Sequence, residues 1–576
     1  MATTTTERRR LLWKLLAACI AAVMVFTVYL AIVSAPSGLP VVGTECPSLR
    51  NITANTAKGL PTQPLVIVTA LFNADCDMLE KTAHAVATST FPVTWVIVDD
   101  HSSEPLCDVA SQAALVVQNT GPRGLGPARQ FVLDQLGNDV DYTAMLDGDD
   151  LIVPEAYEKA VWVLETQRHM TFVGWHLQEF GHTDNTWEAG FHTLDHVYDT
   201  NIFVVSSVVR RDDALRCSAT FRLDLSGGME DWEYWLQLIE CGMAGHTIPT
   251  NDFWYRTRDP EIRKKRWPNL FVRYEETKKY IQGLHTPLRE RTNLPSSGYG
   301  TPFNSPDHAA VVSTQPPRRF DFVLPGYVRS FVATPCRVVS HTHSPSWVVL
   351  CAHFLSNSTH NCSVLFLLET MHVSPLHTLA VTMARALVED RGCTVTLATS
   401  NHDPEHGSSD LETELRFHGV HVFVLPSFCA LGDQVAFLGH LLKSRRINRV
   451  VILEQPLGLA TVGHLRHLFD SKPAFVAVTV HPESNQTAAA LPYLDGVLVP
   501  SKHDKERLVG LGHAVNASVI HPINFWSHAS SSLVLELMLS IPRRANVSTP
   551  RRSLRASLTT VSRPETGVVD MLEFGW

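Results

Sequence analysis

The sequence predicts an α/β protein that has an N-terminal membrane helix and two sheet-forming regions. Residues 15–33 carry no charge, residues 64–283 alternate short apolar runs with helical patterns, and a second such alternation begins near Cys362. Strands that are buried in a parallel sheet are typically continuous apolar runs, and the helices between them cover the sheet. We therefore expect a doubly wound α/β layer followed by a second α/β region.

The N-terminal segment is typical of a signal anchor. Its uncharged stretch approaches the ~20 apolar residues that span a bilayer, and it exceeds the ~7–15 of a cleaved signal peptide. Three arginines and a lysine lie within residues 8–14, and positive residues stay on the cytoplasmic side. We expect residues 1–14 to form a cytoplasmic tail and residues 15–33 a transmembrane signal anchor. A signal peptide cut near Ser34 is the alternative.

This orientation predicts a single-pass type II membrane protein whose remaining chain lies in the lumen of the Golgi or the endoplasmic reticulum. Cys19 lies in the anchor, which leaves ten of the eleven cysteines in a compartment that permits disulfide bonds. They form no Cys-x-x-Cys pair, so neither a zinc site nor a thioredoxin motif is indicated. Sequons for N-glycosylation occur at Asn51, Asn357, Asn361, Asn485, Asn516 and Asn546.

Composition sets the remaining boundaries and excludes one class of partner. The formal net charge is −9, and no long basic block follows the N-terminus, so we expect no nucleic-acid partner. A Pro-, Ser- and Gly-rich stretch separates the two α/β regions and is typical of a linker. The expected parts are a stem (34–62), a first α/β domain (63–284), a linker (285–360), a second α/β domain (361–528) and an irregular tail (529–576).

Carboxylates gather where two predicted strands end. The run VTWVIVDD ends at Asp99 and Asp100, and YTAMLDGDD ends in the three acids of residues 147–150. Ligands of open α/β sheets bind at the carboxyl ends of the strands. Clustered hard oxygen ligands suit Mg²⁺ or Mn²⁺. The alternative is a solvated acidic turn that caps the next helix.

A further pair of acids begins an amphipathic helix in MEDWEYWLQLIE. Glu230 and Asp231 lie in the predicted first turn, where the helix dipole favours negative charge. Favourable capping is one interpretation of this pair. The other is that a carboxylate there acts as general base beside an acceptor hydroxyl.

Taken together, residues 64–258 resemble the inverting glycosyltransferases of family 2, which have the GT-A fold. VIVDDHSSE is similar to the V-D-D-x-S segment of that family, LDGDD to its D-x-D metal motif, MEDWEYWLQL to its acidic helix and YRTRDP to its late Y-R-x-R. PRGLGPARQ is similar to the N-x-G-x-x-x-A-R-N stretch, although Pro122 and Gln130 stand where Asn is usual. Gln237 also replaces a common Arg in the acidic helix.

The resemblance implies a metal-dependent glycosyltransferase that uses a nucleotide-sugar donor, UDP- or GDP-linked, and a glycan or protein acceptor. In it Asp147 and Asp149 would hold Mn²⁺ or Mg²⁺, Asp231 with Glu230 would be catalytic, and Trp232 would bind the acceptor. The donor-binding residues that it implies are Asp99, Asp100, Arg129, Asp147, Asp149, Arg256 and Arg258. No residue selects the sugar, the acceptor or the linkage.

The second α/β region resembles, more faintly, the N-terminal half of family 4 glycosyltransferases of GT-B fold. VLFLLETMHVSPLHTLAVTMARALVEDRGCTVTLATS is similar to their first strand, long helix and second strand. Pro375 lies in a turn that usually has two glycines, and the chain holds too few further residues for the donor-binding domain of such enzymes. Two alternatives to a glycosyltransferase stay open, namely a non-catalytic sugar-binding scaffold and a nucleotidyltransferase.

Overall fold

The structure is a computed structural model of the whole chain. It describes residues 64–188, 197–225, 228–259, 270–289, 317–321, 331–336, 349–354, 362–370, 375–401, 409–453, 456–468, 473–479, 485–510, 520–522 and 541. In these residues no helix combines the length and apolarity needed to cross a bilayer. The predicted anchor, residues 15–33, lies outside them and stays a prediction.

The α/β fold class is confirmed, and the first sheet has nine strands in the order β3-β2-β1-β4-β8-β6-β9-β5, with β7 paired to β6. Its strands are β1 (Leu65–Leu71), β2 (Val93–Asp99), β3 (Leu115–Gln118), β4 (Tyr142–Met145), β5 (Leu151–Ile152), β6 (Met170–Gly181), β7 (Thr186–Trp187), β8 (Val208–Arg210) and β9 (Ala244–Thr257). Strands β1 to β4 are parallel, whereas β8 is antiparallel to its neighbours β4 and β6. The sheet is therefore mixed rather than uniformly parallel.

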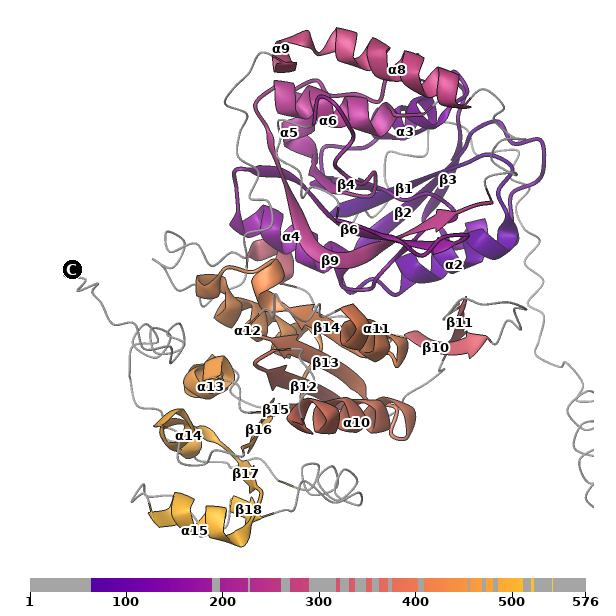
Figure 1. Cartoon of the computed structure of the whole chain (residues 1–576). Coiled ribbons are helices and arrows are strands. Elements are labelled where there is room, and N and C mark those ends of the chain that lie inside the picture. Colours follow the sequence, from indigo (N-terminus) through magenta and orange to yellow (C-terminus); the bar gives the residue numbers. More distant parts are fainter. Residues whose placement is uncertain are drawn as a thin grey trace, which may run out of the picture. The chain divides into compact units, whose positions relative to one another are not determined.

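Helices cover both faces of this sheet (Figure 1). They are α2 (Cys76–Ala87), α3 (Leu125–Leu133), α4 (Ala156–Thr166), α5 (Arg211–Arg216), α6 (Glu230–Glu240), α8 (Leu270–Leu284) and α9 (Thr286–Arg289). Alternate residues of a strand face opposite sides of a sheet, and β1 shows this directly. Leu65 and Ile67 share a core cluster with α2 and α4, whereas Val66 and Val68 share another with α3 and α6.

The second sheet is parallel throughout, in the order β14-β13-β12-β15-β16-β17-β18. Its strands are β12 (Ser363–Leu368), β13 (Thr394–Thr399), β14 (His421–Val424), β15 (Arg449–Leu453), β16 (Ala474–Val478), β17 (Gly496–Val499) and β18 (Ile520–Pro522). The accompanying helices are α10 (Pro375–Glu389), α11 (Ser409–Phe417), α12 (Gln434–Ser444), α13 (Pro456–Leu468), α14 (Asn485–Ala490) and α15 (Lys502–Gly510). Both sheets belong to the unit that spans Ala57–Trp576.

The stretch expected as a linker contains regular structure. The antiparallel pair β10 (Phe331–Cys336) and β11 (Val349–Phe354) lies within it, and so does a 3-10 turn at Arg318–Phe320. Phe320 is fully buried, and its ring lies 4.8 Å from that of Trp162 on α4. Part of this stretch therefore contributes to the core, although its composition is typical of a linker.

Candidate active site

Three strands of the first sheet end side by side and bring carboxylates to one edge. Strands β2, β1 and β4 are neighbours and parallel, and Leu71 at the end of β1 pairs with Asp99 at the end of β2. Asp147 follows β4 directly after Leu146. The structure thus places Asp99 and Asp147 at the carboxyl edge of the sheet, where open α/β folds bind ligands.

The two acids that follow β2 have different surroundings. Asp100 is buried, and its carboxylate accepts hydrogen bonds from the Asn119 side chain (2.8 Å) and from the backbone N–H of Gly124 (2.8 Å). Asp99 is half-buried, and its Oδ1 accepts the N–H of Ser102 at 3.1 Å. Both oxygens of Asp100 therefore bind the loop before α3. Of the two acids, Asp99 is the better placed to contact a donor.

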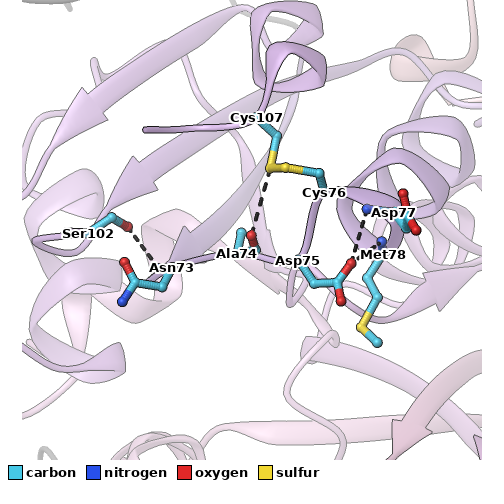
Figure 2. Close-up of a disulfide and its surroundings, with 8 residues drawn as sticks. All are labelled: Asn73, Ala74, Asp75, Cys76, Asp77, Met78, Ser102 and Cys107. Carbon is cyan, nitrogen blue, oxygen red and sulfur yellow. Dashed lines mark hydrogen bonds between the residues drawn. A yellow bond between two sulfur atoms is a disulfide. The ribbon is translucent and has the colours of Figure 1, made fainter. Parts of the chain in front are cut away.

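A disulfide and an asparagine tie together the loops that follow β1 and β2. Asn73, with a left-handed φ of 45°, donates its backbone N–H to Ser102 Oγ at 2.9 Å. Cys76, at the start of α2, is bonded to Cys107. Figure 2 shows both links, which come from the same side of the loop between β1 and α2. They fix the segment that begins at Asp99 and so position its carboxylate.

Loss of this disulfide should weaken donor binding as well as stability. The double change Cys76→Ser/Cys107→Ser frees the loop after Asp99, and we expect it to cost about 2–4 kcal/mol of unfolding free energy and to raise the donor Kd. The matched control is Cys362→Ser/Cys393→Ser in the second sheet, because the two bridges have the same sequence separation, 31.

Thermal unfolding and donor titration of both double variants check this prediction. The control should lose comparable stability and keep the wild-type donor Kd. Equal weakening of donor binding in both double variants would show that the Cys76–Cys107 bridge acts on global stability alone.

Arg129 lies buried between two groups of carboxylates. Its guanidinium donates to Asp147 Oδ1 and to Glu230 Oε1, both at 2.6 Å, and only 1% of the residue is exposed. Helices α3 and α6 must approach closely for this, since a Cβ on Gly126 would lie 2.9 Å from the carbonyl oxygen of Arg222 and 3.3 Å from Cβ of Glu230. The resemblance implies that Arg129 binds the donor. In the structure its guanidinium instead joins the D-x-D aspartate to the acidic helix.

One guanidinium faces more than one carboxylate here, and the charges do not balance. Burial raises the pKa of Glu230 to about 7, although Arg129 opposes this. Burial also raises the pKa of Asp231, against the opposing effects of Arg129 and of a hydrogen bond from Asn201. Although burial disfavours its charge, Asp147 and Glu230 raise the pKa of Arg129 above its usual value. A carboxylate with a raised pKa accepts a proton more readily near neutral pH, as a general base requires.

The two neighbours at the start of α6 have separate roles. Asp231 is half-buried, and Asn201 Nδ2 donates to its Oδ2 at 2.9 Å, which fixes the carboxylate. Trp232, expected to bind the acceptor, is fully buried, and its Nε1 donates to the carbonyl oxygen of Val197 at 2.7 Å. The expectation for Trp232 is corrected accordingly, because the face of α6 that carries it packs into the core cluster shared with β1.

Two arginines at the end of β9 hold the D-x-D loop. Arg258 donates to Asp149 Oδ2 at 2.5 Å. Arg256 donates from Nε to the carbonyl oxygen of Asp149 and from its backbone N–H to Asp150 Oδ1, both at 2.8 Å. The guanidinium of Arg256 also lies over the ring of Phe180, 4.3 Å from its centroid. Both arginines thus lie beside the carboxylates where the resemblance implies phosphate contacts.

The carboxylates of the loop fit a divalent cation that is shared with a substrate. Burial, followed by repulsion from Asp147, raises the pKa of Asp149, and burial with Asp149 raises that of Asp150. A cation would relieve this surplus of negative charge. In the part of the chain that the structure describes, no group of three or more His, Cys, Asp or Glu side chains is placed to hold a metal ion. The set therefore suits Mg²⁺ or Mn²⁺ held by one or two carboxylates together with substrate phosphates.

Two sequence comparisons find similar proteins for the front part of the chain. Residues 66–222 match the model of Glycosyl transferase family 2. The EpsE protein of Bacillus subtilis (strain 168), which is named as a glycosyltransferase, is 25% identical over 214 residues, or 35% of this chain and 74% of EpsE. Residues 66–222 are therefore similar to the family 2 glycosyltransferases. The mixed sheet with helices on both faces is the GT-A arrangement that the resemblance implies.

Solved structures resemble the glycosyltransferase domain more distantly. TarS 1–349 of S. aureus in complex with UDP-GlcNAc is 16% identical, with a TM-score of 0.30, over 34% of this chain and 59% of TarS 1–349. The mannosyltransferase PcManGT of Pyrobaculum calidifontis, in complex with GDP-Man and Mn²⁺, is 14% identical, with a TM-score of 0.25, over 34% of this chain and 59% of PcManGT. This chain thus spans less than two thirds of both solved chains. Because these TM-scores are low, the similarity to family 2 rests on the sequence matches.

Sequence reasoning missed three asparagines that shape the candidate site. Asn73 bonds the loop after β2, Asn119 bonds Asp100, and Asn201 bonds Asp231. Asparagine is common in turns, where its side chain bonds nearby backbone. That preference was the only signal in the sequence, and it does not reveal which distant group an asparagine will meet.

Proposed function

We propose that the protein is an inverting glycosyltransferase that moves a sugar from a nucleotide-sugar to a hydroxyl of a glycan or protein. One observation carries the proposal, namely the contact chain from Asp147 through Arg129 to Glu230, with Asp231 next in sequence. This chain connects carboxylates suited to a metal and a diphosphate with a carboxylate suited to a base. A scaffold that only binds sugars has no need for such an arrangement.

The reaction follows from these positions. Asp231 takes the proton of the acceptor hydroxyl. The acceptor oxygen forms a bond to the anomeric carbon as the bond from that carbon to the diphosphate oxygen breaks, and attack from the opposite face inverts the configuration. Arg256 and Arg258 stabilise the charge that develops on the leaving nucleoside diphosphate, since guanidinium matches phosphate geometry. A divalent cation held by Asp147 and Asp149 would supply Lewis-acid stabilisation of the same charge.

A UDP- or GDP-linked donor suits the site, because its diphosphate is the group that the paired carboxylates, a cation and two arginines together recognise. A nucleotidyltransferase is the second enzyme class that uses metal-binding carboxylates of this kind. The base at the start of α6 favours a glycosyltransferase, since Asp231 has a raised pKa and a fixed orientation.

We also propose that the protein acts in the lumen of the Golgi or the endoplasmic reticulum, held by a signal anchor at residues 15–33. Disulfide bonds support this placement, because they persist in oxidising compartments. The described residues contain the pairs Cys76–Cys107, Cys217–Cys241 and Cys362–Cys393.

Release of nucleoside diphosphate by the full-length chain tests the proposed function. A panel of UDP- and GDP-sugars is assayed with Mn²⁺, with Mg²⁺ and with a chelator. We expect turnover with one donor class that stops in the chelator. The absence of both binding and turnover with every donor would reject the proposal. Release of pyrophosphate from nucleoside triphosphates would indicate a nucleotidyltransferase.

The change Asp149→Ala should weaken metal-dependent donor binding by about 10–100-fold, since it removes a charged contact worth ~1.5–3 kcal/mol. Calorimetric titration with the donor, in metal and in chelator, measures this. The control is Asp224→Ala, which removes a carboxylate that pairs with Arg222 at the surface. Donor binding in Asp149→Ala that equals wild type would remove this residue from the metal site.

A further inference from the structure

The core of the glycosyltransferase domain continues into the second α/β region. Trp162 on α4 packs edge-on against Phe437 on α12, with ring centroids 4.7 Å apart. Both belong to one buried cluster that also includes Leu365 and Leu367 of β12. The described part of the second region is therefore packed against the helix that follows the D-x-D loop.

Buried charges cross this contact. Glu158 on α4 accepts hydrogen bonds from Arg445 (2.5 Å) and from His440 (2.6 Å), and all three side chains are fully buried. Burial alone would raise the pKa of Glu158, but Arg445 and His440 lower it to about 2. A buried carboxylate of this kind depends on its partners, so Glu158 requires the second region to stay charged.

A second arginine reaches the glycosyltransferase domain at a different point. Arg416, on α11, has Nη2 3.4 Å from Asp252 Oδ1 and Nε 3.4 Å from Glu155 Oε2. Both carboxylates have no exposed side-chain surface. Glu155 Oε1 also accepts the backbone N–H of Val422 at 3.3 Å. The second region therefore supplies a cation and a backbone donor to two buried acids of the first.

These two acids lie at one end of the strand pairing that carries the D-x-D loop at its other end. Strand β5 follows Asp150 directly and pairs with β9, with Leu151 opposite Trp254 and Ile152 opposite Phe253. Asp252 is the next residue of β9, and its backbone carbonyl accepts the N–H of Val153 at 2.9 Å. Its side chain also accepts from Lys159 of α4 at 2.5 Å. Arg416 thus contacts the end of the β5–β9 pairing that lies away from the D-x-D loop.

The other end of the same pairing holds the donor-binding groups. Asp149 and Asp150 precede β5, and Arg256 lies near the end of β9. Arg256 donates to the backbone carbonyl oxygen of Asp149 and to the carboxylate of Asp150. A shift of β9 along β5 would therefore move Arg256 relative to the D-x-D carboxylates.

We propose that Arg416, in the second α/β region, is a positioning residue for the diphosphate end of the donor site. It holds Asp252 on β9 and Glu155 after β5 and thereby fixes how Arg256 meets Asp149 and Asp150. The inference rests on the proposed function, and it gives the second region a role in the reaction of the first.

Donor and acceptor kinetics of Arg416→Gln test the inference in the full-length chain. We expect a donor Kd and donor KM raised by about 2–30-fold, the range for coupling through a packed network, with the acceptor KM unchanged. The matched control is Arg445→Gln, which removes the arginine that pairs with Glu158 in the first turn of α4. The control should lose at least as much thermal stability and keep the wild-type donor Kd.

A double-mutant cycle separates positioning from general stability. Arg416→Gln, Asp252→Asn and their combination should be non-additive in donor binding if the two side chains act together. Arg416→Lys, which keeps the charge, should restore part of the donor affinity and serves as the test variant if Arg416→Gln does not fold.

Three outcomes would overturn the inference. An Arg416→Gln donor Kd equal to wild type would do so, and so would an equal rise in the Arg445→Gln control, or additive effects in the cycle. These outcomes leave the proposed function intact, because the wild-type chain still binds and turns over its donor. Absence of donor binding by wild type would reject both together.

Discussion

Replacement of Asp231 by Asn should abolish sugar transfer and leave donor binding intact. Asn keeps the size of the side chain but cannot take the acceptor proton, so we expect kcat to fall by about 10²–10⁴-fold, the usual contribution of a general base. The donor groups Asp147, Asp149 and Arg256 are untouched, so the donor Kd should stay at the wild-type value. Steady-state transfer kinetics and donor titration of Asp231→Asn measure the two effects separately.

The pH profile gives an independent check on this base. Burial raises the pKa of Asp231 above its ordinary value, while Arg129 and Asn201 oppose the rise. Only the deprotonated form can act as base, so wild-type kcat should fall as pH falls through this raised pKa. The change Asn201→Leu removes a hydrogen bond that lowers the pKa, and it should therefore move the acid limb of the profile to higher pH.

Two results would contradict this role of Asp231. Equal loss of donor binding and of transfer in Asp231→Asn would place the residue in the donor site. An acid limb that persists unchanged in a residually active Asp231→Asn would assign that limb to another group, such as Glu230, whose pKa is about 7. Asp224→Asn serves as the control carboxylate, because it lies at the surface beside Arg222.

Replacement of Arg129 by Gln should have the largest effect on stability. The guanidinium is buried and bonded to Asp147 and Glu230. Its removal leaves the buried Glu230 and the half-buried Asp147 without their cation, which costs about 3–5 kcal/mol. Thermal unfolding of Arg129→Gln measures the loss, and donor binding should fall with it because Asp147 loses its fixed position.

The loss in Arg129→Gln should depend on pH in a defined direction. Burial raises the folded-state pKa of Glu230 from the ordinary 4.5 to about 7, so its contribution to stability is present at acid pH and is lost as pH rises through that value. Arg129 lowers the pKa of Glu230 and of Asp231, so both folded-state pKa values should rise in its absence. The stability contributed by the protonated carboxyls should then be lost over a pH range that extends higher. The variant should therefore be most unstable near pH 8 and recover part of its stability near pH 5.

An exposed arginine provides the control for this experiment. Arg222→Gln breaks a pair with Asp224 in which both side chains are substantially exposed, at 34% and 49%, and surface pairs contribute only ~0–1 kcal/mol. A loss of stability in Arg129→Gln as small as in Arg222→Gln, or one that grows as pH falls, would contradict the charge balance inferred for this site.

The sequence predicted the carboxylates of the site because their positions are local. Asp99 and Asp147 each follow an apolar run, and the ends of parallel strands meet at one edge of a sheet. Asp231 follows the start of an amphipathic helix, where the pattern of apolar residues is equally local. The transmembrane prediction for residues 15–33 has the same basis and lies outside the described residues.

The partners of these carboxylates were not predictable from the sequence. The resemblance implied that Arg129 and Asp100 bind the donor, whereas the structure turns both toward other protein groups. Trp232 has an aromatic surface suited to a sugar, but helix phase alone does not say how deeply it is buried. No sequence pattern connects Asn201 with Asp231.

The sequence by itself determined the α/β class, the similarity of residues 66–222 to family 2 glycosyltransferases and the acids at the strand and helix ends, because these depend on short-range patterns and motifs. Only the tertiary structure decided which groups balance those acids. Arg129 and Arg416 each meet carboxylates that are distant along the chain, and Arg416 comes from beyond a stretch that is typical of a linker. Pairing between distant charges depends on how helices and strands pack, and no local pattern encodes it.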